Sequence, residues 1–393
     1  MPFLKKKTKK APAQTGDNQR IEVDETGIMD IPYLVLTLLL MVIGLIMLFS
    51  ASYARASYIT GNPASYFVSQ SIYAVIGIGV MLLAGRYNYQ RLQKFALPLM
   101  AISIILLVLV LVMGSSTNGA KRWINLGIRF QPSEIAKFTV ILFFATYMTH
   151  HQKQMHTLRY GIAPYLAILG VVALLLLLEP HKSATLIILG VGFIMMILGG
   201  SKPKHLWILV GLGVAVVGAY VLYKYFKSSG DYASNRIMAW LNPDKYASDE
   251  SYQIVQSRYA IGPGGLSGVG LGKSNQKNMY LPEEHNDYIF AIVCEELGLI
   301  GAIGILLLFM MLILRGYWIS MHAYDRFGKL MAAGLTTLLA IQVFLNVGVV
   351  TNLLPPTGIS LPFFSSGGTA LIIQMAEIGV VLSISRWTKK SMN

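Results

Sequence analysis

Long apolar runs alternate with short polar segments over most of this 393-residue chain. A helix of about 20 apolar residues can cross a bilayer, and ten runs reach or approach that length. The pattern predicts an all-α integral membrane protein of about ten transmembrane helices, with both termini on one side. We see no internal repeat, so an inverted-repeat transporter gains no support. The predicted spans are residues 31–49, 68–84, 96–113, 134–149, 162–178, 183–199, 205–223, 287–313, 330–350 and 367–385.

The polar segments divide the chain into three parts. Residues 1–30 are predicted to form a disordered basic tail, residues 31–386 the membrane domain, and residues 387–393 a C-terminal tail. Within the membrane domain, residues 224–286 are predicted to form a large outer loop. The first apolar run is longer than the core of a signal peptide and lacks a small-residue cleavage site. We therefore expect it to remain as the first helix.

The charges predict the orientation. The formal net charge is +14, only 13% of the residues are charged, and the mean hydropathy is +0.57. With a cytoplasmic N-terminus every short inner loop is positive, whereas the outer loop 50–67 has Arg55 as its single basic residue. The positive excess is thus explained by topology and by attraction to anionic membrane lipids. Both termini are predicted to be cytoplasmic, and nucleic acid is not expected as a partner.

Two outer segments, 114–133 and 224–286, break this rule because both are rich in Lys and Arg. Two interpretations remain open. The basic side chains contact lipid headgroups, or they hold an anionic substrate such as a phosphate or pyrophosphate. The candidates for the second role are Lys121, Arg122, Arg258 and Lys273.

The segment LPEEHNDYIFAIVCEELGLIG (281–301) places ionisable residues at the mouth of the eighth apolar run. A charge near the membrane boundary is costly and is therefore often functional. Asp287 is the strongest candidate, because on a helix its face carries small residues that would let a ligand approach closely. The other ionisable residues here are Glu283, Glu284 and His285, and the small residues are Ala291, Cys294 and Gly298.

A structural role is the alternative for these acids. Asp287 would then form an ion pair with Arg or Lys of a neighbouring span. The same interpretation applies to Glu295 and Glu296, which lie two turns deeper in the run.

The sequence predicts neither a nucleotide site nor a dedicated metal site. The loop GPGGLSGVGLGKS (262–274) has Ser267 where a phosphate loop needs glycine, so its glycines are expected to allow tight turns and close approach to a ligand or the membrane surface. His285 has no second histidine nearby at a zinc-site spacing. A loosely held Mg²⁺ or Mn²⁺ shared with substrate phosphates remains an alternative.

Two segments rich in helix breakers are predicted to line a cavity. Residues 179–182 (EPHK) form a very short turn between the fifth and sixth runs, and residues 352–369 contain three prolines and three glycines. Irregular backbone at membrane depth is tolerated where it lines a cavity, although a simple tight turn is the alternative for 179–182. The predicted lining residues are Glu179, His181, Lys182, Ser365, Ser366 and Gly367.

Four blocks in order make the chain resemble the SEDS family, the shape, elongation, division and sporulation proteins that include RodA, FtsW and SpoVE. The resemblance covers residues 31–386, and the long basic tail is closer to the FtsW and SpoVE branch. The chain departs from the family pattern at His181, Asn286 and Ser366, where an acid, Thr and Tyr are common. The blocks are NGAKRWINLGIRFQPSEIAK (118–137), QSRYAIGPGGLSGVGLG (256–272), LPEEHNDYIFAIVCEELGLIG (281–301) and LLPPTGISLPFFSSGGTA (353–370).

The resemblance implies a GT-C-like glycosyltransferase of the bacterial cytoplasmic membrane. It would polymerise lipid II into β-1,4-linked glycan strands beside a class B penicillin-binding protein, in division, elongation or sporulation. The family's essential aspartate falls on Asp287, the expected base, and no nucleotide cofactor is required. A lipid II flippase and a non-catalytic scaffold remain alternatives. The expected substrate contacts are Lys121, Arg122 and Arg258 at the pyrophosphate, with Gln256, Ser257, Lys273, Glu283 and His285 elsewhere.

Overall fold

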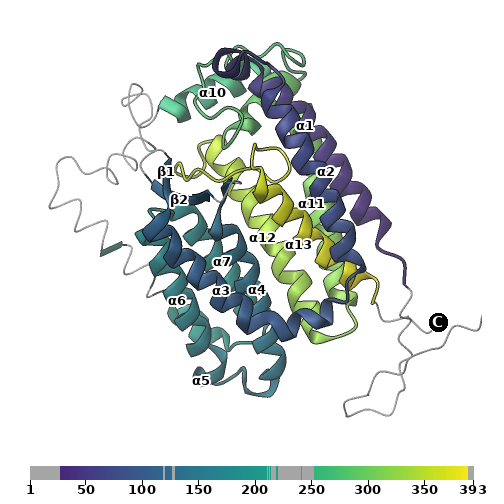
Figure 1. The fold of residues 1–393 in the computed structure, drawn as a ribbon, viewed down its shortest axis with the longest axis vertical. Coiled ribbons are helices and arrows are strands. Elements are labelled where there is room, and N and C mark those ends of the chain that lie inside the picture. Colours follow the sequence, from purple (N-terminus) through teal and green to yellow (C-terminus); the bar gives the residue numbers. More distant parts are fainter. Residues whose placement is uncertain are drawn as a thin grey trace, which may run out of the picture.

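The computed structural model describes residues 27–117, 120–125, 129–209, 211, 213, 218, 219, 240 and 252–387. Most of its helices lie side by side in a bundle with loops at both ends (Figure 1). The helices are α1 (Ile31–Thr60), α2 (Ser65–Arg86), α3 (Leu92–Met113), α4 (Pro132–His150), α5 (Leu158–Gly161), α6 (Ala163–Leu178), α7 (Lys182–Leu198), α10 (Tyr252–Gly264), α11 (Ile289–His322), α12 (Arg326–Val350) and α13 (Thr369–Ser385), with 3-10 turns η1 (Tyr89–Arg91) and η2 (Gln152–Gln154).

Apart from the seventh run, the predicted apolar runs fall largely within these helices. Six helices of the described chain are long and apolar enough to cross a membrane, and α7 and α13 are shorter apolar helices. The seventh predicted span, 205–223, lies largely outside the described residues, as do the tail up to residue 26 and the predicted outer loop before residue 252, apart from Trp240. The prediction of a polytopic helical membrane protein is confirmed.

The first helix shows why the observed elements extend beyond the apolar runs. The side chain of Asp30 accepts a hydrogen bond from the Tyr33 amide at 2.9 Å and caps the first turn, which also contains Pro32. α1 then continues past the predicted end at residue 49 to Gly61, which ends it in a left-handed conformation with φ 68°. Residues 50–60 contain neither Gly nor Pro. Polarity therefore ends the apolar run without ending the helix.

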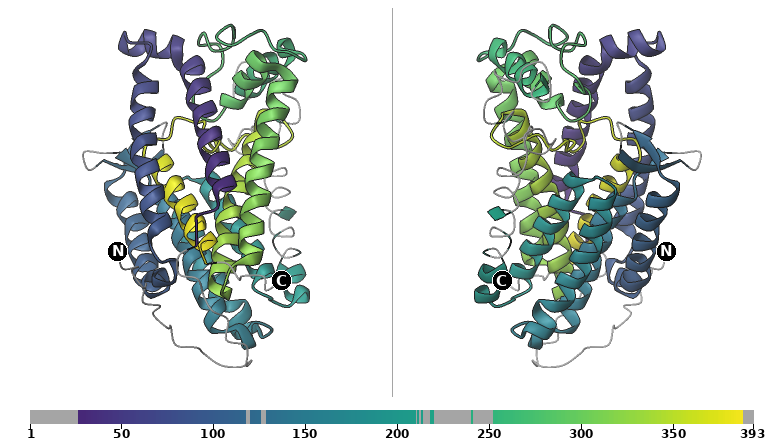
Figure 2. Two further views of the ribbon diagram at one scale, coloured as in Figure 1. Left: turned by 90° about the vertical axis from the view of Figure 1, so that its right-hand side faces the viewer. Right: turned by 90° about the vertical axis from the view of Figure 1, so that its left-hand side faces the viewer.

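The loops form two groups at opposite ends of the bundle (Figure 2). At the first, called the terminus end, Arg386 donates to the carbonyl oxygen of Gly27, and Arg315 forms an ion pair with Asp30 at 2.7 Å. The opposite end, called the site end, holds segments that the sequence analysis placed outside. The described residues of these segments are 114–117, 120–125, 129–131, 179–182, 265–288 and 351–368. The alternation predicted from the charges is therefore present in the fold.

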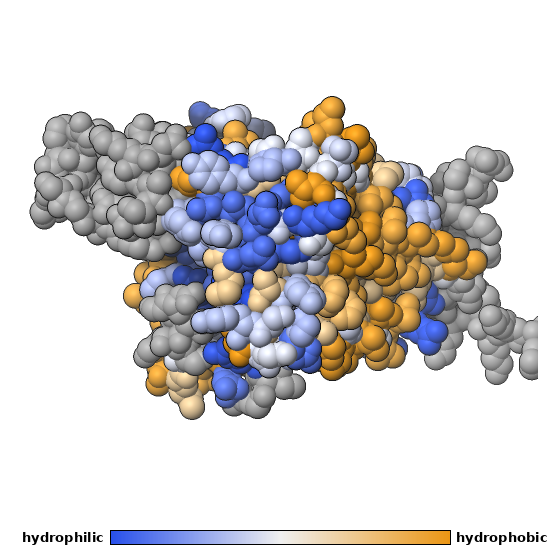
Figure 3. Space-filling view, turned by 90° about the horizontal axis from the view of Figure 1, so that it is seen from above, coloured by the Kyte–Doolittle hydropathy of each residue, from blue (hydrophilic) through white to orange (hydrophobic). Residues whose placement is uncertain are grey.

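The site end carries a small sheet that the hydropathy pattern did not predict. β1 (Ser115–Thr117), β2 (Ala120–Asn125) and β3 (Arg129–Phe130) pair antiparallel in the order β1-β2-β3. These strands are too short to produce a readable alternation of apolar and polar residues. Seen from this end, polar residues gather in the middle of the face and apolar residues lie beside them (Figure 3).

α11 consists of two parts that meet at Gly298, where φ is 67° and ψ is −170°. Residues 289–296 are all buried, whereas exposed and buried positions alternate with helical spacing from Leu299 onward. The lipid-facing part of this helix therefore begins at Leu299. The predicted run 287–313 combined this span with a buried segment that precedes it.

Candidate active site

Asp287 lies in the turn that leads into α11, and its backbone is held from two sides. The side-chain amide of Asn346 in α12 donates to the carbonyl oxygen of Asp287 at 2.8 Å and to that of Ile359 at 2.6 Å. The hydroxyl of Ser365 donates to the carbonyl oxygen of Asn286 at 2.7 Å. Asn346 was missed in the sequence analysis, although an amide within an apolar span was the available signal.

The carboxylate of Asp287 lies against the backbone of Gly358. A Cβ atom at position 358 would stand 3.1 Å from Oδ2 of Asp287, and Gly358 has a φ of +67°. Residues other than glycine rarely adopt that backbone conformation. Both the backbone angle and the contact therefore favour glycine here. The Asp287 side chain itself is only half-buried, so part of it stays accessible.

The surroundings of Asp287 weaken its acidity. Burial raises the pKa of Asp287 to about 6, and the negative charge of Glu283 acts in the same direction. The positive charge of Arg122 and the neighbouring His285 oppose this rise. A carboxylate whose pKa lies near the working pH is a better base than an ordinary one. Glu283 thus tunes Asp287 in this geometry.

Arg122 reaches the site from β2. Its Nη2 atom donates to the carbonyl oxygen of Pro180, in the turn between α6 and α7, at 2.5 Å. Its charge also lowers the pKa of Asp287 and that of Glu179. Three regions that were predicted separately therefore meet: the basic outer segment, this turn and Asp287. The side chain of Lys121 lies outside the described part of the structure.

The turn between α6 and α7 places polar groups inside the protein. Glu179 is 1% exposed, and burial raises its pKa to about 7 although Arg122 acts in the opposite direction. Burial and nearby positive charges lower the pKa of His181 to about 3, so its ring is neutral and lies 3.3 Å from the Gln131 amide nitrogen. Lys182 is exposed. Glu179 and His181 therefore face the interior, whereas Lys182 does not.

Glu284 anchors the Asp287 turn to α1. Its carboxylate is fully buried, and Nε of Arg55 donates to Oε1 at 2.8 Å. Burial raises the pKa of Glu284, but the nearby His285 ring and the hydrogen bond from Arg55 outweigh it and hold the pKa below its usual range. This ion pair explains why the predicted outer loop 50–67 contains a basic residue, Arg55.

Several residues that were predicted to contact substrate or to line a cavity are buried and contact other parts of the protein instead. Ser257 is fully buried, and its hydroxyl donates to the carbonyl oxygen of Val350 at 2.7 Å. His285 is 5% exposed, and its ring centroid lies 4.7 Å from that of Tyr66. The hydroxyl of Ser365 accepts a hydrogen bond from the backbone amide of Leu361 and donates one to the carbonyl oxygen of Asn286. Besides Arg122, Lys182 and Asp287, the predicted residues that keep accessible surface are Gln256, Arg258, Lys273, Glu283, Ser366 and Gly367.

The small-residue face next to Asp287 is covered by protein, so the prediction of an open approach along it was wrong. Ala291 is fully buried and Cys294 is 8% exposed. The glycine loop 265–270 packs on this part of α11, where a Cβ atom at Gly268 would stand 2.2 Å from the carbonyl oxygen of Glu296. Gly268 therefore allows this loop to approach a helix.

Glu295 and Glu296 have structural partners in the loop that precedes α11. Nζ of Lys277 lies 2.9 Å from Oε1 of Glu296, and the hydroxyl of Ser50 donates to the same carboxylate. Glu295 accepts a hydrogen bond from the backbone amide of Asn275 at 2.8 Å. The predicted ion pair is confirmed for Glu296, but its cation comes from the loop and not from a neighbouring span.

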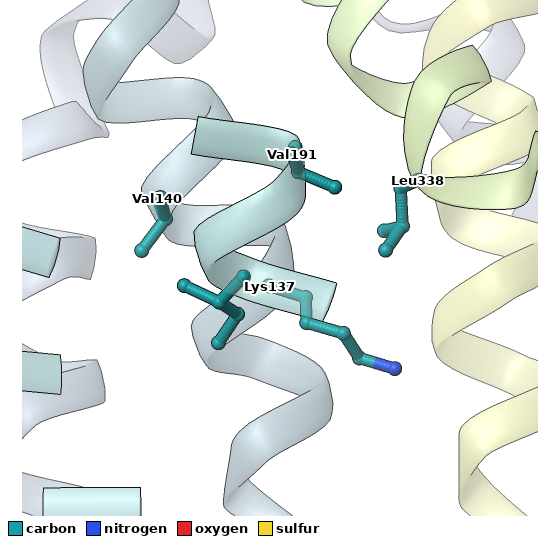
Figure 4. A pocket seen from close by; sticks show the side chains of 5 residues that line it. Lys137, Val140, Val191 and Leu338 are labelled. Carbon is teal, nitrogen blue, oxygen red and sulfur yellow. The ribbon is translucent and has the colours of Figure 1, made fainter. Parts of the chain in front are cut away.

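A buried ion pair on α4 was missed in the sequence analysis. Nζ of Lys137 lies 2.6 Å from Oε2 of Glu134, and the Lys137 side chain is 5% exposed. Lys137 borders a narrow, largely apolar space with Val140, Val191 and Leu338, and its amino group points away from Val140 (Figure 4). An acid and a base three positions apart in an apolar run were the available signal.

The described residues contain no group of three or more His, Cys, Asp or Glu side chains that could hold a metal ion. A divalent cation shared with substrate phosphates would need fewer protein ligands. That alternative therefore stays a prediction.

A family model for cell cycle proteins of the FtsW, RodA and SpoVE type matches residues 31–390. The chain belongs to the FtsW/RodA/SpoVE family. The match covers the whole described membrane bundle, including the Asp287 turn and the segments that contact it. The resemblance inferred from the four blocks is confirmed.

Individual members of the FtsW/RodA/SpoVE family are similar over nearly their full length. A probable peptidoglycan glycosyltransferase FtsW of Geobacter metallireducens is 37% identical over 371 residues, which are 94% of this chain and 97% of the relative. Stage V sporulation protein E of Bacillus subtilis is 39% identical over 363 residues, with 92% and 98% covered.

Solved structures of the family share the fold. The rod shape determining protein RodA of Thermus thermophilus aligns with a TM-score of 0.67 and 28% identity, covering 91% of this chain and 97% of RodA. A second solved structure is described as the structural coordination of polymerization and crosslinking by a peptidoglycan synthase complex. One chain of it aligns with a TM-score of 0.76 and 26% identity. That alignment covers 91% of this chain and 98% of the other.

Proposed function

We propose that this chain is a peptidoglycan glycosyltransferase that polymerises lipid II into β-1,4-linked glycan strands. The observation that carries the proposal is the carboxylate of Asp287, half-buried with a pKa of about 6 at the end of a membrane bundle. Gly358 lies against it, and the positive charge of Arg122 acts on it. Family membership and the activity in the FtsW relatives' names support the same conclusion.

Chain growth needs one base and nearby positive charge. The 4-hydroxyl oxygen of the acceptor sugar forms a bond to the anomeric carbon of the donor, and the bond from that carbon to undecaprenyl pyrophosphate breaks with its electrons. Asp287 takes the hydroxyl proton, since a pKa of about 6 leaves it largely ionised at neutral pH. Arg122 supplies positive charge for the departing pyrophosphate. Because the donor carries its own leaving group, the reaction needs no nucleotide.

The test is direct synthesis by the purified protein. We expect full-length protein in liposomes to convert lipid II into glycan polymer without any other protein or nucleotide. A lipid II flippase would move lipid II between leaflets in the same liposomes and leave it as a monomer. A scaffold would do neither. Absence of polymer under conditions where the protein is folded would contradict the proposed activity.

The polymerisation rate is expected to fall at acidic pH. Asp287 must be ionised to accept a proton, and its pKa is about 6. The rate should therefore be nearly constant above that pH and should decrease about tenfold per pH unit well below it. Removing the negative charge of Glu283 in Glu283→Gln lowers the pKa of Asp287, so the acidic limb should move to lower pH. A limb that stays in place or moves upward would contradict this assignment of the base.

We also propose that the terminus end faces the cytoplasm and the site end faces outward, as the positive inner loops support. In a Cys294→Ala background, a cysteine at the exposed position Lys273 should react with a membrane-impermeant maleimide in intact cells. A cysteine at the exposed position Lys153 should react only after the cells are opened. The reverse pattern would overturn this orientation.

A class B penicillin-binding protein is the partner that we propose for this chain. The family resemblance implies it, and the structural similarity to a chain of a peptidoglycan synthase complex supports it. Co-purification of the two proteins from membranes tests the assignment. Recovery of the chain without such a partner, under conditions that preserve other membrane complexes, would count against it.

A further inference from the structure

An apolar groove of about 310 Å³ opens at the terminus end of the bundle between α2, the η1 turn and α13. α2 and α13 lie side by side there (Figure 1). Both α2 and the helix formed by η1 and α3 are long and apolar enough to cross a membrane. The groove therefore lies where acyl chains meet headgroups. Its walls include Leu83, Tyr87, Leu92, Val380 and Ser383.

Two of the polar groups in the walls of this groove, the hydroxyls of Ser383 and Tyr89, are already hydrogen-bonded. The hydroxyl of Ser383 donates to the carbonyl oxygen of Tyr87. The hydroxyl of Tyr89 donates to Oδ1 of Asp325 at 2.8 Å. What the groove offers an occupant is therefore hydrocarbon surface, which suits an acyl chain and not a sugar or a free ion.

Three basic residues neighbour the groove-lining residues of α2, η1 and α3 in the chain. Arg86 ends α2, Arg91 ends η1 and Lys94 lies in the first turn of α3, and all three are exposed. The guanidinium of Arg91 lies over the ring of Tyr87, with Cζ 5.8 Å from the ring centroid, so it is held beside the groove. Arg86 and Lys94 flank it in the sequence. The rim thus combines several positive charges with an apolar wall.

Two acids of the described chain at this end already have partners of their own. Asp30 forms an ion pair with Arg315. Asp325 accepts hydrogen bonds from the Tyr89 hydroxyl, the Gln90 amide and the backbone amide of Gly328. An anionic headgroup at the rim would therefore meet the exposed basic side chains first.

We propose that the groove is a binding site for one anionic phospholipid of the leaflet at the terminus end. An acyl chain occupies the groove, and the headgroup phosphate lies against Arg91 with Arg86 and Lys94 beside it. Lipid chains are as apolar as the groove, so exchanging one chain for another changes the free energy little. Selectivity therefore comes from the headgroup. Basic pockets between helices on the cytoplasmic side bind anionic lipids in this way.

The experiment counts the lipids that stay bound to the full-length protein. The protein is reconstituted in nanodiscs of dioleoyl phosphatidylcholine and dioleoyl phosphatidylglycerol, released into the gas phase and weighed by native mass spectrometry. The wild type is expected to retain one phosphatidylglycerol in about tenfold preference over phosphatidylcholine, since each basic residue near the surface favours an anionic lipid severalfold. The variant Arg86→Ala/Arg91→Ala/Lys94→Ala should lose this preference.

A matched control separates a built site from general attraction to the basic end. Lys153, Arg159 and Lys204 are also exposed at the terminus end but do not border the groove. Replacing these three residues by Ala should leave the retained phosphatidylglycerol unchanged. Equal losses in the two triple variants would mean that boundary charge alone attracts the lipid, and the proposal would be overturned.

A second variant tests the groove itself. Leu83 is 68% exposed, so the larger ring of Leu83→Trp can enter the groove without disturbing the core. We expect Leu83→Trp to retain at least fivefold less phosphatidylglycerol while its thermal unfolding stays like that of the wild type. Full retention by this variant would exclude the groove as the binding site.

Discussion

Asp287→Asn is expected to abolish glycan polymerisation while the protein still inserts and folds. The substitution keeps the size of the side chain and removes the carboxylate that accepts the proton. Losing a general base lowers a rate by a factor of about 100 to 10,000. The backbone contacts from Asn346 and Ser365 do not involve the carboxylate, so the turn should keep its place. The measurement is polymer formed from lipid II by purified protein, with thermal unfolding to check the fold.

Glu283→Gln is the matched control for this experiment. Glu283 lies in the same turn and is also accessible, and its negative charge acts on Asp287. Its carboxylate accepts a hydrogen bond from the Asn286 side chain, and the amide oxygen of Gln can accept the same bond. At neutral pH we expect it to polymerise lipid II within a few-fold of the wild-type rate. Wild-type activity in Asp287→Asn would show that Asp287 is not the base. A scaffold would support growth with either variant.

Gly358→Ala is expected to lower polymerisation about 100-fold, because misplacing a catalytic group by about 1 Å can cost that much. The added Cβ would stand 3.1 Å from Oδ2 of Asp287, so the carboxylate must shift or turn. The left-handed backbone at this position adds a cost of about 1–2 kcal/mol to folding. Single-turnover rates with lipid II and thermal unfolding should be measured on the same preparation.

Gly61→Ala separates strain from the loss of the contact. Gly61 has a φ of +68°, nearly the same as Gly358, but a Cβ atom there meets nothing within 4 Å. Both variants should lose similar stability, and only Gly358→Ala should lose activity. If Gly61→Ala slows polymerisation as much as Gly358→Ala, the backbone strain and not the carboxylate contact explains the effect.

Much of the bundle could be predicted from the sequence because a bilayer imposes a simple rule on it. A spanning helix must be apolar for about 20 residues, so its position is visible in the chain. The alternation of basic and non-basic loops likewise predicted which loops share an end. The site was indicated by ionisable residues near a predicted membrane boundary, where charge is costly, and Asp287 lies in a turn at the site end.

The contacts around Asp287 could not be predicted in this way, because they join distant parts of the chain. Arg55 and Glu284 are 229 positions apart, and no periodicity links them. The apposition of Gly358 to the carboxylate depends on how segment 351–368 folds back on α12. The packing on the face of Ala291 and Cys294 could not be predicted either. Helical spacing shows which residues share a face, but it does not show which segment packs on that face.

The two-part construction of α11 has a consequence for the biogenesis of the protein. A carboxylate is expensive in hydrocarbon, and Glu295 and Glu296 find their partners in Ser274, Asn275 and Lys277, which are synthesised just before them. With the site end outward, as proposed, residues 289–296 would cross the membrane together with this loop and would not have to enter lipid as a helix. The apolar span would then begin at Leu299. Because Gly358 follows Asp287 in the chain, their contact forms only after segment 351–368 has been made.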